Sequence, residues 1–334
     1  ALLSQALGLI RDRVLAFHFG AGKELDIYYA AFRIPDLLYA SIASFVAVTV
    51  LIPFLLEKIE GKQGLRDAKA FVDSIFTVFI VSMVAVVSVT YVLTPWLGRF
   101  VVPGFDQASY ATYIQLSQIL LLSPLLLGIS NLFGSLTQSL RRFFVFAAGP
   151  ILYNLGIIFG VLVLLPRMGI TGVTIGVVIG ALLHVAIQLP VLAHERLVPW
   201  FTRSIEWKDI ARVVRLSVPR TIALSAAQLA TIVLIKMASS MELGSIAVFT
   251  LAMNLQSIPL SIVGMSYSVA AFPTLAKLWT GGNKELFTGQ ILSAARHILF
   301  WSFPAIVLFV VLRAQIVRSI LGSGAFDWSA TVIP

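Results

Sequence analysis

The sequence predicts an all-α protein, namely a polytopic bundle of transmembrane helices. Three observations support this fold class: the composition is too apolar for a protein surrounded by water, the apolar residues gather in runs of membrane length, and the loops between the runs alternate in charge. Hydrophobic residues make up 59% of the chain and charged residues only 12%, about half the charged share of an average soluble domain. Lipid is therefore the expected solvent of this chain.

Nine apolar runs are long enough to cross a bilayer, which takes about 20 residues of helix. They are too long for the strands of a membrane barrel, so we expect helices and about nine to ten spans. The runs cover residues 1–19, 26–56, 69–98, 108–139, 143–165, 170–194, 210–238, 244–276 and 286–312.

The loops between the runs alternate between basic and cation-poor. The basic loops lie within residues 58–69, 141–142, 196–215 and 277–284, and they hold 13 of the 24 Lys and Arg residues. Because positively charged loops stay in the cytoplasm, these loops and the start of the first helix are expected inside. The net charge of +9 is then explained by the loops, and it indicates no nucleic-acid partner.

A weak internal repeat predicts two lobes. The segment starting KELDIYYAAFRIP at residue 23 is similar to MELGSIAVFTLAM at residue 241, and both continue to a proline before a basic loop. Repeats of this kind place the substrate site of secondary transporters between two halves. We expect an N-terminal lobe over 1–200, a cytoplasmic amphipathic linker on the inner leaflet over 201–215, and a second lobe over 216–334, pseudo-symmetric to the first, with a central cavity between them.

Charged side chains inside the first two runs are the main site candidates, because charges within a membrane are costly and usually functional. Arg11 and Asp12 lie in the first run, and Asp26, Tyr29, Arg33 and Asp36 follow at i, i+3, i+7 and i+10 of the second. That spacing puts the latter four on one helix face, which must look into a wet cavity or at charges of the first helix. For Asp12, Asp26 and Asp36 a structural role is an equal alternative, such as an ion pair of Asp26 with Arg33 or Arg11. Arg11 and Arg33 suit a phosphate ligand.

Single amides and hydroxyls are weaker candidates, since they more often join helices. They are Asn131, Ser135, Gln138, Asn154, Thr221, Ser225, Gln228 and Asn254. Gly172, Gly176 and Gly180 form a smooth helix face that we expect to pack within the bundle.

No enzyme, cofactor or metal site is predicted. The sequence has no P-loop, GxSxG or HExxH motif, no cysteine, and four histidines without metal-ligand spacing.

Two segments carry a family resemblance. LGLIRDRVLAFHFGAGKELDIYYAAFRIPDLL, residues 7–38, followed by Pro53, resembles the N-terminal signature of the MurJ/MviN family, and RSILGSGAFDWSAT, residues 318–331, resembles the loop after that family's ninth helix. The family comprises lipid II flippases of the multidrug/oligosaccharidyl-lipid/polysaccharide exporter superfamily. The resemblance implies a two-lobed protein of about fourteen helices in the bacterial cytoplasmic membrane. Because Ala1 already lies inside an apolar run, we expect the sequence to be part of a longer protein.

The resemblance also implies roles for the charged residues. Arg11 matches a cavity-lining arginine, Asp12 the acid beside it, Asp26 an aspartate of the second helix, and Arg33 a position that is usually Lys or Arg. They would hold the pyrophosphate of an undecaprenyl-linked anionic glycolipid in a cavity of net positive charge, with the acids, including Asp36, orienting the arginines. Asn254 aligns with a further cavity arginine. Other charged positions of the family are occupied here by Gln5, Tyr39, Ala40 and Ser44.

Three hypotheses follow. The first is a flippase for the peptidoglycan precursor lipid II, working by alternating access. The second is an exporter of another lipid-linked oligosaccharide of the same superfamily, because several family arginines are replaced. The third is a non-transporting membrane scaffold that recruits cell-wall synthesis proteins. A pump for cationic drugs is disfavoured, since deep acidic residues are few.

Overall fold

The computed structural model describes residues 2–42, 48–59, 64–267, 271, 274–275, 278 and 281–326, and across them the regular secondary structure is helical, as predicted. Some residues named in the sequence analysis lie outside the described residues. They are Ser44, Pro273, parts of the basic loops at 58–69 and 277–284, and residues 327–331 of the C-terminal motif. Pro53 is described.

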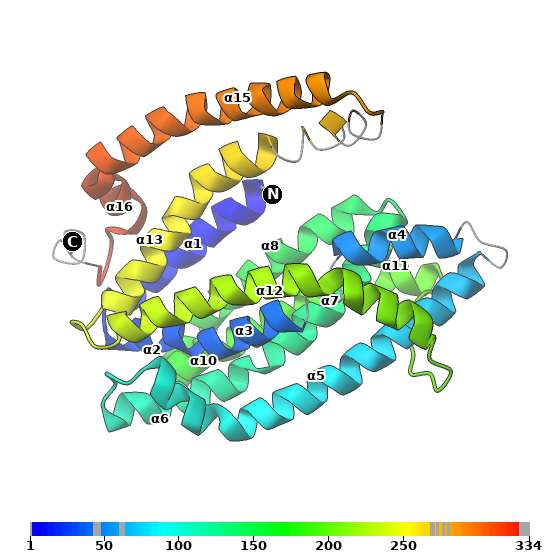
Figure 1. Cartoon of the computed structure of the whole chain (residues 1–334). Helices are drawn as coiled ribbons and strands as arrows, with labels where there is room; N and C mark the ends of the chain where they lie inside the picture. The colour runs from blue at the N-terminus through cyan, green and yellow to red at the C-terminus, as the bar shows by residue number, and fades with distance from the viewer. Residues whose placement is uncertain are drawn as a thin grey trace.

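The helices follow one another as a series of long rods and short segments (Figure 1). They are α1 (Leu2–Phe19), α2 (Lys23–Ala31), α3 (Arg33–Ser41), α4 (Val48–Ile59), α5 (Leu65–Val101), α6 (Gln107–Leu120), α7 (Leu122–Ser139), α8 (Phe143–Phe159), the π-helix η2 (Gly160–Leu164), α9 (Leu165–Met168), α10 (Ile170–Ala186), α11 (Leu189–His194), α12 (Trp207–Ala238), α13 (Ser245–Pro259), the π-helix η3 (Leu260–Met265), α15 (Lys284–Val311) and α16 (Arg313–Leu321).

Seven helical stretches in the described part of the chain are long and apolar enough to cross a membrane. They correspond to the third to ninth apolar runs of the sequence. The first run forms α1, whose Arg11, Asp12 and Arg13 lower its hydropathy. The second run is expected as one helix but is divided into α2, α3 and α4.

The division of the second run begins at Phe32, between α2 and α3. Pro35 has no N–H to donate to the carbonyl of Ala31, and its ring crowds that carbonyl, so a continuous α-helix is disfavoured here. At this break the Arg33 side chain donates from Nε to the Tyr29 carbonyl at 3.1 Å. The break therefore helps to fix the direction of one predicted site residue.

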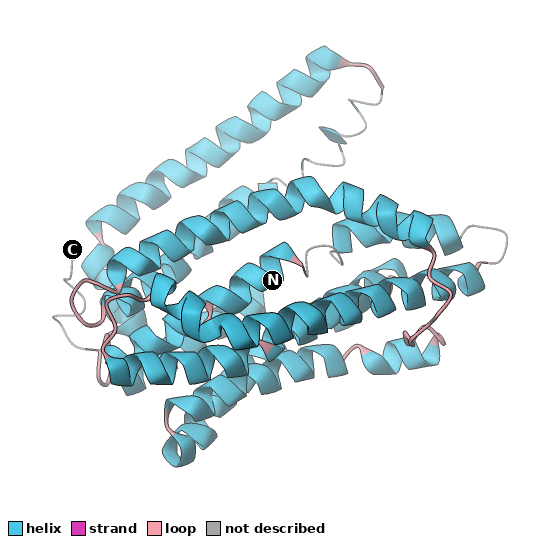
Figure 2. Cartoon of the chain, turned by 60° about the horizontal axis from the view of Figure 1, so that its bottom comes forward, coloured by secondary structure: helices cyan, strands magenta, loops and turns pink. Residues whose placement is uncertain are grey.

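The two ends of the bundle differ (Figures 1 and 2). One end gathers the end of α4, the start of α5 and the α11–α12 connection, which belong to the basic segments assigned to the cytoplasm from the sequence. The other end gathers α2, α16 and the connections after α1, α5 and α12; we call it the outer end. Toward the cytoplasmic end α15 diverges from the rest of the bundle, as Figure 2 shows.

The linker agrees only in part with its prediction. An amphipathic helix is expected within the linker at 201–215; residues 207–215 are helical as the start of α12, whereas residues 197–206 are not. The non-helical part is held on α5, where Trp200 N–H donates to Asp73 Oδ1 at 2.8 Å and Glu206 N–H donates to Ser74 Oγ at 3.3 Å. These polar side chains of α5 satisfy the linker backbone, so no helix is needed to do so.

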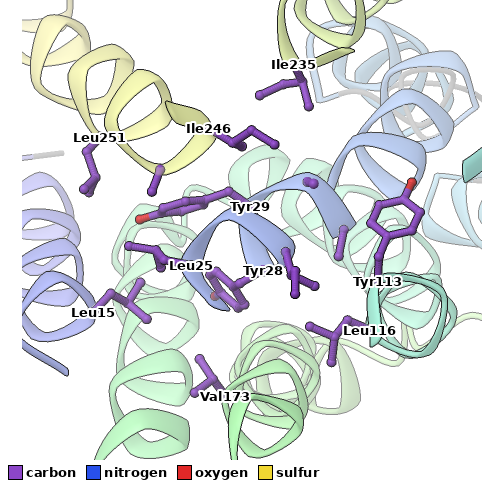
Figure 3. Close-up of a cluster of buried hydrophobic side chains, with 14 of the residues drawn as sticks. Leu15, Leu25, Tyr28, Tyr29, Tyr113, Leu116, Val173, Ile235, Ile246 and Leu251 are labelled. Atoms are coloured by element: carbon purple, nitrogen blue, oxygen red, sulfur yellow. The ribbon is translucent and has the colours of Figure 1, made fainter. Parts of the chain in front are cut away.

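A shared apolar core joins the lobes at the outer end. Leu15 of α1 and Tyr28 of α2 are buried there with Ile235 of α12 and Ile246 and Leu251 of α13 (Figure 3). This core fixes the outer ends of the helices that carry the predicted site.

The glycine face of α10 packs against α8 and η2, as expected for packing within the bundle. A Cβ on Gly180 would lie 2.4 Å from the Tyr153 carbonyl oxygen, and one on Gly176 would lie 2.6 Å from the Gly160 Cα. Both obstacles are backbone atoms, which cannot move aside as a flexible side chain can. The contact therefore requires glycine.

Replacing Gly180 by leucine should destabilise the N-terminal lobe. Overpacking of this kind costs about 1–3 kcal/mol, so we expect a lower thermal unfolding midpoint for purified protein in detergent. Gly289→Leu in α15 is the matched control, because no atom lies within 4 Å of the added Cβ. An equal loss in both variants would contradict the packing argument.

Candidate substrate cavity

A cavity of about 350 Å³ lies between the lobes, inward of the outer-end core. It is lined by residues of α1, α2, α3, α8, α12 and α13. They are Arg11, Leu15, Tyr28, Tyr29, Phe32, Arg33, Asp36, Tyr153, Ile157, Gln228, Thr231, Phe249, Thr250, Met253 and Asn254. The predicted residues Arg11, Arg33, Asp36 and Asn254 therefore meet in one place.

Arg11 is held by hydrogen bonds on two sides. Its Nε and Nη2 donate to Asp12 Oδ1 at 2.9 and 2.8 Å, and its Nη1 donates to Asn154 Oδ1 of α8 at 3.1 Å. The planar guanidinium is thus fixed in orientation, with part of its donor set still facing the cavity.

Asp12 lies behind Arg11 rather than in the cavity wall, and it is only 3% exposed. Its second oxygen accepts from Asn254 Nδ2 of α13 at 3.0 Å. Asp12 therefore links the cavity arginine of the N-terminal lobe to the second lobe.

Arg33 and Asp36 lie on the cavity wall one turn apart on α3. Arg33 Nη1 lies 4.0 Å from Asp36 Oδ2, at the limit of an ion pair. Together Arg11, Arg33 and Asp36 give the described wall one net positive charge, and Asp12 balances it from behind. The cavity is therefore less positive than the resemblance implied.

Asp26 does not line this cavity. Its Oδ2 accepts from Gly244 N–H and its Oδ1 from Ala247 N–H, both at 2.7 Å. Gly244 is the residue that precedes α13 and Ala247 lies in its first turn, so the carboxylate sits at the helix N-terminus, where a negative charge is stabilising. The pairing of Asp26 with Arg33 or Arg11, considered from the sequence, is replaced by this helix cap, which the sequence could not reveal because residues 26 and 244 are far apart.

Further contacts close the outer end around this cap. A Cβ on Gly244, whose φ is +95°, would lie 2.3 Å from the Ala21 carbonyl oxygen. Ala325 N–H, in the turn after α16, donates to the Phe17 carbonyl at the end of α1 at 2.9 Å. Each contact joins the two lobes, so the outer end is shut.

An ion pair within the N-terminal lobe lies beside these contacts. Lys23 Nζ lies 3.0 Å from an oxygen of Asp106. Hydrogen bonds from Ser109 and Lys23 lower the pKa of Asp106, which keeps this carboxylate ionised at the outer surface.

At the cytoplasmic end, α4 is joined to the start of α12. Lys58 Nζ lies 2.6 Å from Asp209 and 2.9 Å from Glu206, and Arg212 lies 3.3 Å from Glu57. Partial burial opposes the charge of Lys58, but the two carboxylates outweigh it and raise its pKa. This cluster joins α4 to the second lobe outside the cavity.

The weaker candidates have mixed placements. Gln228 lines the cavity, and Asn154 holds Arg11. Ser225 bonds Ser41 at 2.9 Å across the lobes, and Asn131 donates to the Tyr39 hydroxyl at 2.9 Å. Ser135 and Gln138 donate to carbonyls of their own helix. Tyr28, Tyr153, Thr231, Phe249 and Thr250 also line the cavity. Nothing in the sequence distinguishes them, because such residues are common in any apolar helix.

A two-lobed helical bundle, with a charged cavity at the seam and one end shut, is the architecture of a secondary transporter. The chain belongs to the lipid II flippase MurJ family, because the family model of that description matches residues 15–333. Seven membrane-length helices agree with a multi-pass protein of the bacterial inner membrane.

Individual relatives agree with this assignment. A lipid II flippase MurJ of Burkholderia cenocepacia is 24% identical over 334 residues, covering 98% of this chain and 64% of the relative. A probable lipid II flippase MurJ of Rhizobium tropici is 26% identical over 344 residues, covering 99% and 63%. The chain thus spans somewhat less than two thirds of the length of these relatives.

Solved structures show the same fold. Lipid II flippase MurJ in an inward closed conformation superposes with a TM-score of 0.82 at 24% identity, over 99% of this chain and 68% of that one. An inward-facing multidrug resistance MATE family transporter of the MOP superfamily superposes with a TM-score of 0.74 at 15% identity, over 98% of this chain and 74% of that one. The two-lobed transporter fold predicted from the sequence is confirmed.

Proposed function

We propose that the full-length protein carries the head group of lipid II, the undecaprenyl-pyrophosphate-linked peptidoglycan precursor, from the inner to the outer leaflet. The observation that carries this proposal is the meeting of Arg11 and Arg33 in one cavity between the lobes of a MurJ family protein. A pyrophosphate dianion cannot cross hydrocarbon unpaired. Two arginines at the seam provide charge-assisted hydrogen bonds where the head group needs them.

The transport step follows from which end is shut. The outer end is closed by Asp26 on α13 and by Ala325 on α1. The head group enters from the cytoplasmic side while the polyprenyl tail stays in the lipid, and Arg11 and Arg33 hold the pyrophosphate. Rocking of the lobes breaks the outer contacts and exposes the cavity to the other leaflet.

The test uses bacteria depleted of their own flippase. The full-length protein should restore the lipid II that is exposed on the outer leaflet, measured by labelling intact cells. Arg11→Ala combined with Arg33→Ala should reduce that exposure at least about 100-fold, because two charge-assisted contacts are lost. Arg99→Ala, an exposed arginine at the end of α5 outside the cavity, is the control and should support normal exposure.

Exporting a different lipid-linked oligosaccharide is the second candidate. It is supported by Asn254, which donates to Asp12 where the family resemblance implies an arginine. Membrane-located wild-type protein that leaves lipid II inside, yet exposes another polyprenyl-pyrophosphate glycolipid, would favour this candidate. Failure to expose either would reject both.

A further inference from the structure

Two buried hydroxyl groups at the cavity wall have no hydrogen-bond partner. They are Tyr29 OH on α2 and Thr250 Oγ1 on α13, one from each lobe. The residues are only 6% and 9% exposed, and both line the cavity that holds Arg11. Buried hydroxyls are usually hydrogen-bonded. Other described hydroxyls are also unpaired, namely those of Tyr113, Ser117, Ser123 and Ser217, but only Tyr29 and Thr250 among them line this cavity, where a ligand can reach them.

The register of α2 against α13 places these two residues at one level along the helices. The bond from Ala247 to Asp26 fixes the two helices side by side at the outer end. Tyr29 and Thr250 each follow three residues later, about 4.5 Å further inward along the helices. Figure 3 shows the Tyr29 hydroxyl pointing away from α2 toward α1 and α13.

The arginine layer follows at the next level. Asn254 lies four residues beyond Thr250, about 6 Å further inward along α13. Arg33 lies four residues beyond Tyr29, just past the break at Phe32. The hydroxyls therefore stand between the outer cap at Asp26 and the charged groups that we assign to the substrate. For a ligand held by the arginines, these two hydroxyls are therefore polar groups on the side of the outer end.

The arginines alone do not fill the hydrogen-bonding capacity of a pyrophosphate. A guanidinium has five N–H donors, and Arg11 directs three of its contacts to Asp12 and Asn154. Arg33 uses its Nε for the Tyr29 carbonyl. A pyrophosphate diester presents four non-bridging oxygens, each able to accept more than one hydrogen bond. Neutral hydroxyl groups add hydrogen-bond donors without the cost of burying another charge.

We propose that the hydroxyls of Tyr29 and Thr250 donate to phosphate oxygens from opposite lobes. With Arg11 and Arg33 they would form one anion-binding site, called the seat below. This inference rests on the proposed function and names two further residues for the same ligand. Both oxygens are sealed from solvent here, so a side-chain rotation accompanies binding. A phosphate in the seat bridges the lobes directly beside the outer closure.

The experiment measures binding to purified full-length protein with two probes, lipid II and inorganic pyrophosphate. Tyr29→Phe and Thr250→Val remove one hydroxyl each with little change in shape. Each should weaken binding of both probes about tenfold, as for a hydrogen bond to a charged group. The thermal unfolding midpoint should not fall, because the hydroxyls have no partner without the ligand. Tyr113→Phe is the matched control: Tyr113 is fully buried in α6 and does not line the cavity.

Arg11→Ala separates this inference from the proposed function. If Arg11→Ala loses both probes while Tyr29→Phe and Thr250→Val bind as wild type, the hydroxyl seat is rejected and the proposed substrate stands. Weaker lipid II binding with unchanged pyrophosphate binding also rejects the seat, since the hydroxyls then contact another part of the lipid. If wild-type protein binds pyrophosphate but not lipid II, the proposed substrate is rejected. Pyrophosphate binding by Tyr29→Phe and Thr250→Val then still tests the role of the hydroxyls.

Discussion

Asp26→Ala should open the outer end of the protein. The substitution removes the acceptor for two N–H groups at the N-terminus of α13, which Asp26 holds at 2.7 Å across the lobe boundary. Loss of a helix cap costs about 1–2 kcal/mol, and hydrogen bonds to a charged acceptor lie at the upper end of that range. We therefore expect the open-to-closed ratio at the outer end to rise about 30-fold. Asp26→Asn keeps one acceptor oxygen and should give a smaller rise.

A single introduced cysteine reports this opening, because the 334 residues contain none. Leu251 lies in the shared outer core and is 2% exposed, so Leu251→Cys should react with an external, membrane-impermeant maleimide only when the lobes part there. Leu116→Cys, fully buried in the N-terminal lobe, reports unfolding instead and should stay unreactive. Asp106→Ala is the matched carboxylate control, since its partner Lys23 is in the same lobe. If Leu251→Cys is labelled equally in the protein with Asp26 and in the Asp26→Ala variant, Asp26 does not hold the outer end closed.

Asp12→Ala should destabilise the whole protein strongly. It leaves the Arg11 guanidinium without its carboxylate and Asn254 without its acceptor. Breaking a buried ion pair by removing one partner costs about 3–5 kcal/mol, because the other charge remains buried. Arg11 keeps some exposure, with 21% of its side chain accessible, so we expect a loss of about 3 kcal/mol in the free energy of unfolding.

The double variant Arg11→Met with Asp12→Asn tests the origin of that loss. Removing both charges should recover most of the stability, because replacing a buried pair by uncharged groups is often close to neutral. It should not recover lipid II binding, since the anion's cationic partner is gone. Denaturation curves and binding measurements on the two single variants and the double variant complete the cycle. Equal stability losses in the single and double variants would show that the pair is not the cause.

The sequence predicted the elements that depend on composition and periodicity. The all-helical bundle follows from the length of the apolar runs, and the placement of Tyr29, Arg33 and Asp36 on one cavity wall follows from helical spacing. The assignment of the cytoplasmic side stays a prediction from loop charge. The length of an apolar run, the spacing of residues on a helix and the number of Lys and Arg residues in a loop can all be read from a single sequence.

The remaining features depend on contacts between distant segments. Nothing local to Asp26 indicates that residues 244–247 will present N–H groups to it, and the spacing of Asp26 with Arg33 suggests an ion pair instead. The mixture of basic and apolar residues in the linker indicates an amphipathic helix, but the helix starts only at Trp207. Two N–H groups before it donate instead to Asp73 and Ser74 of α5. Thr250 resembles any other threonine of an apolar helix until its missing partner is seen.

The α12 helix continues for 32 residues from the linker to the outer end, about 48 Å at 1.5 Å per residue. Its start is tied to Lys58 through Asp209, and the residue after its end, Ser239, accepts at 3.5 Å from the Gly104 N–H. A rod of this length acts as a lever: a tilt of about 10° displaces one end by about 8 Å relative to the other. Both ends of the cavity are therefore connected through one helix, in which Pro219 is the point where bending is easiest. A change in the ion pairs at the start of α12 can then move its far end, on the opposite side of the membrane.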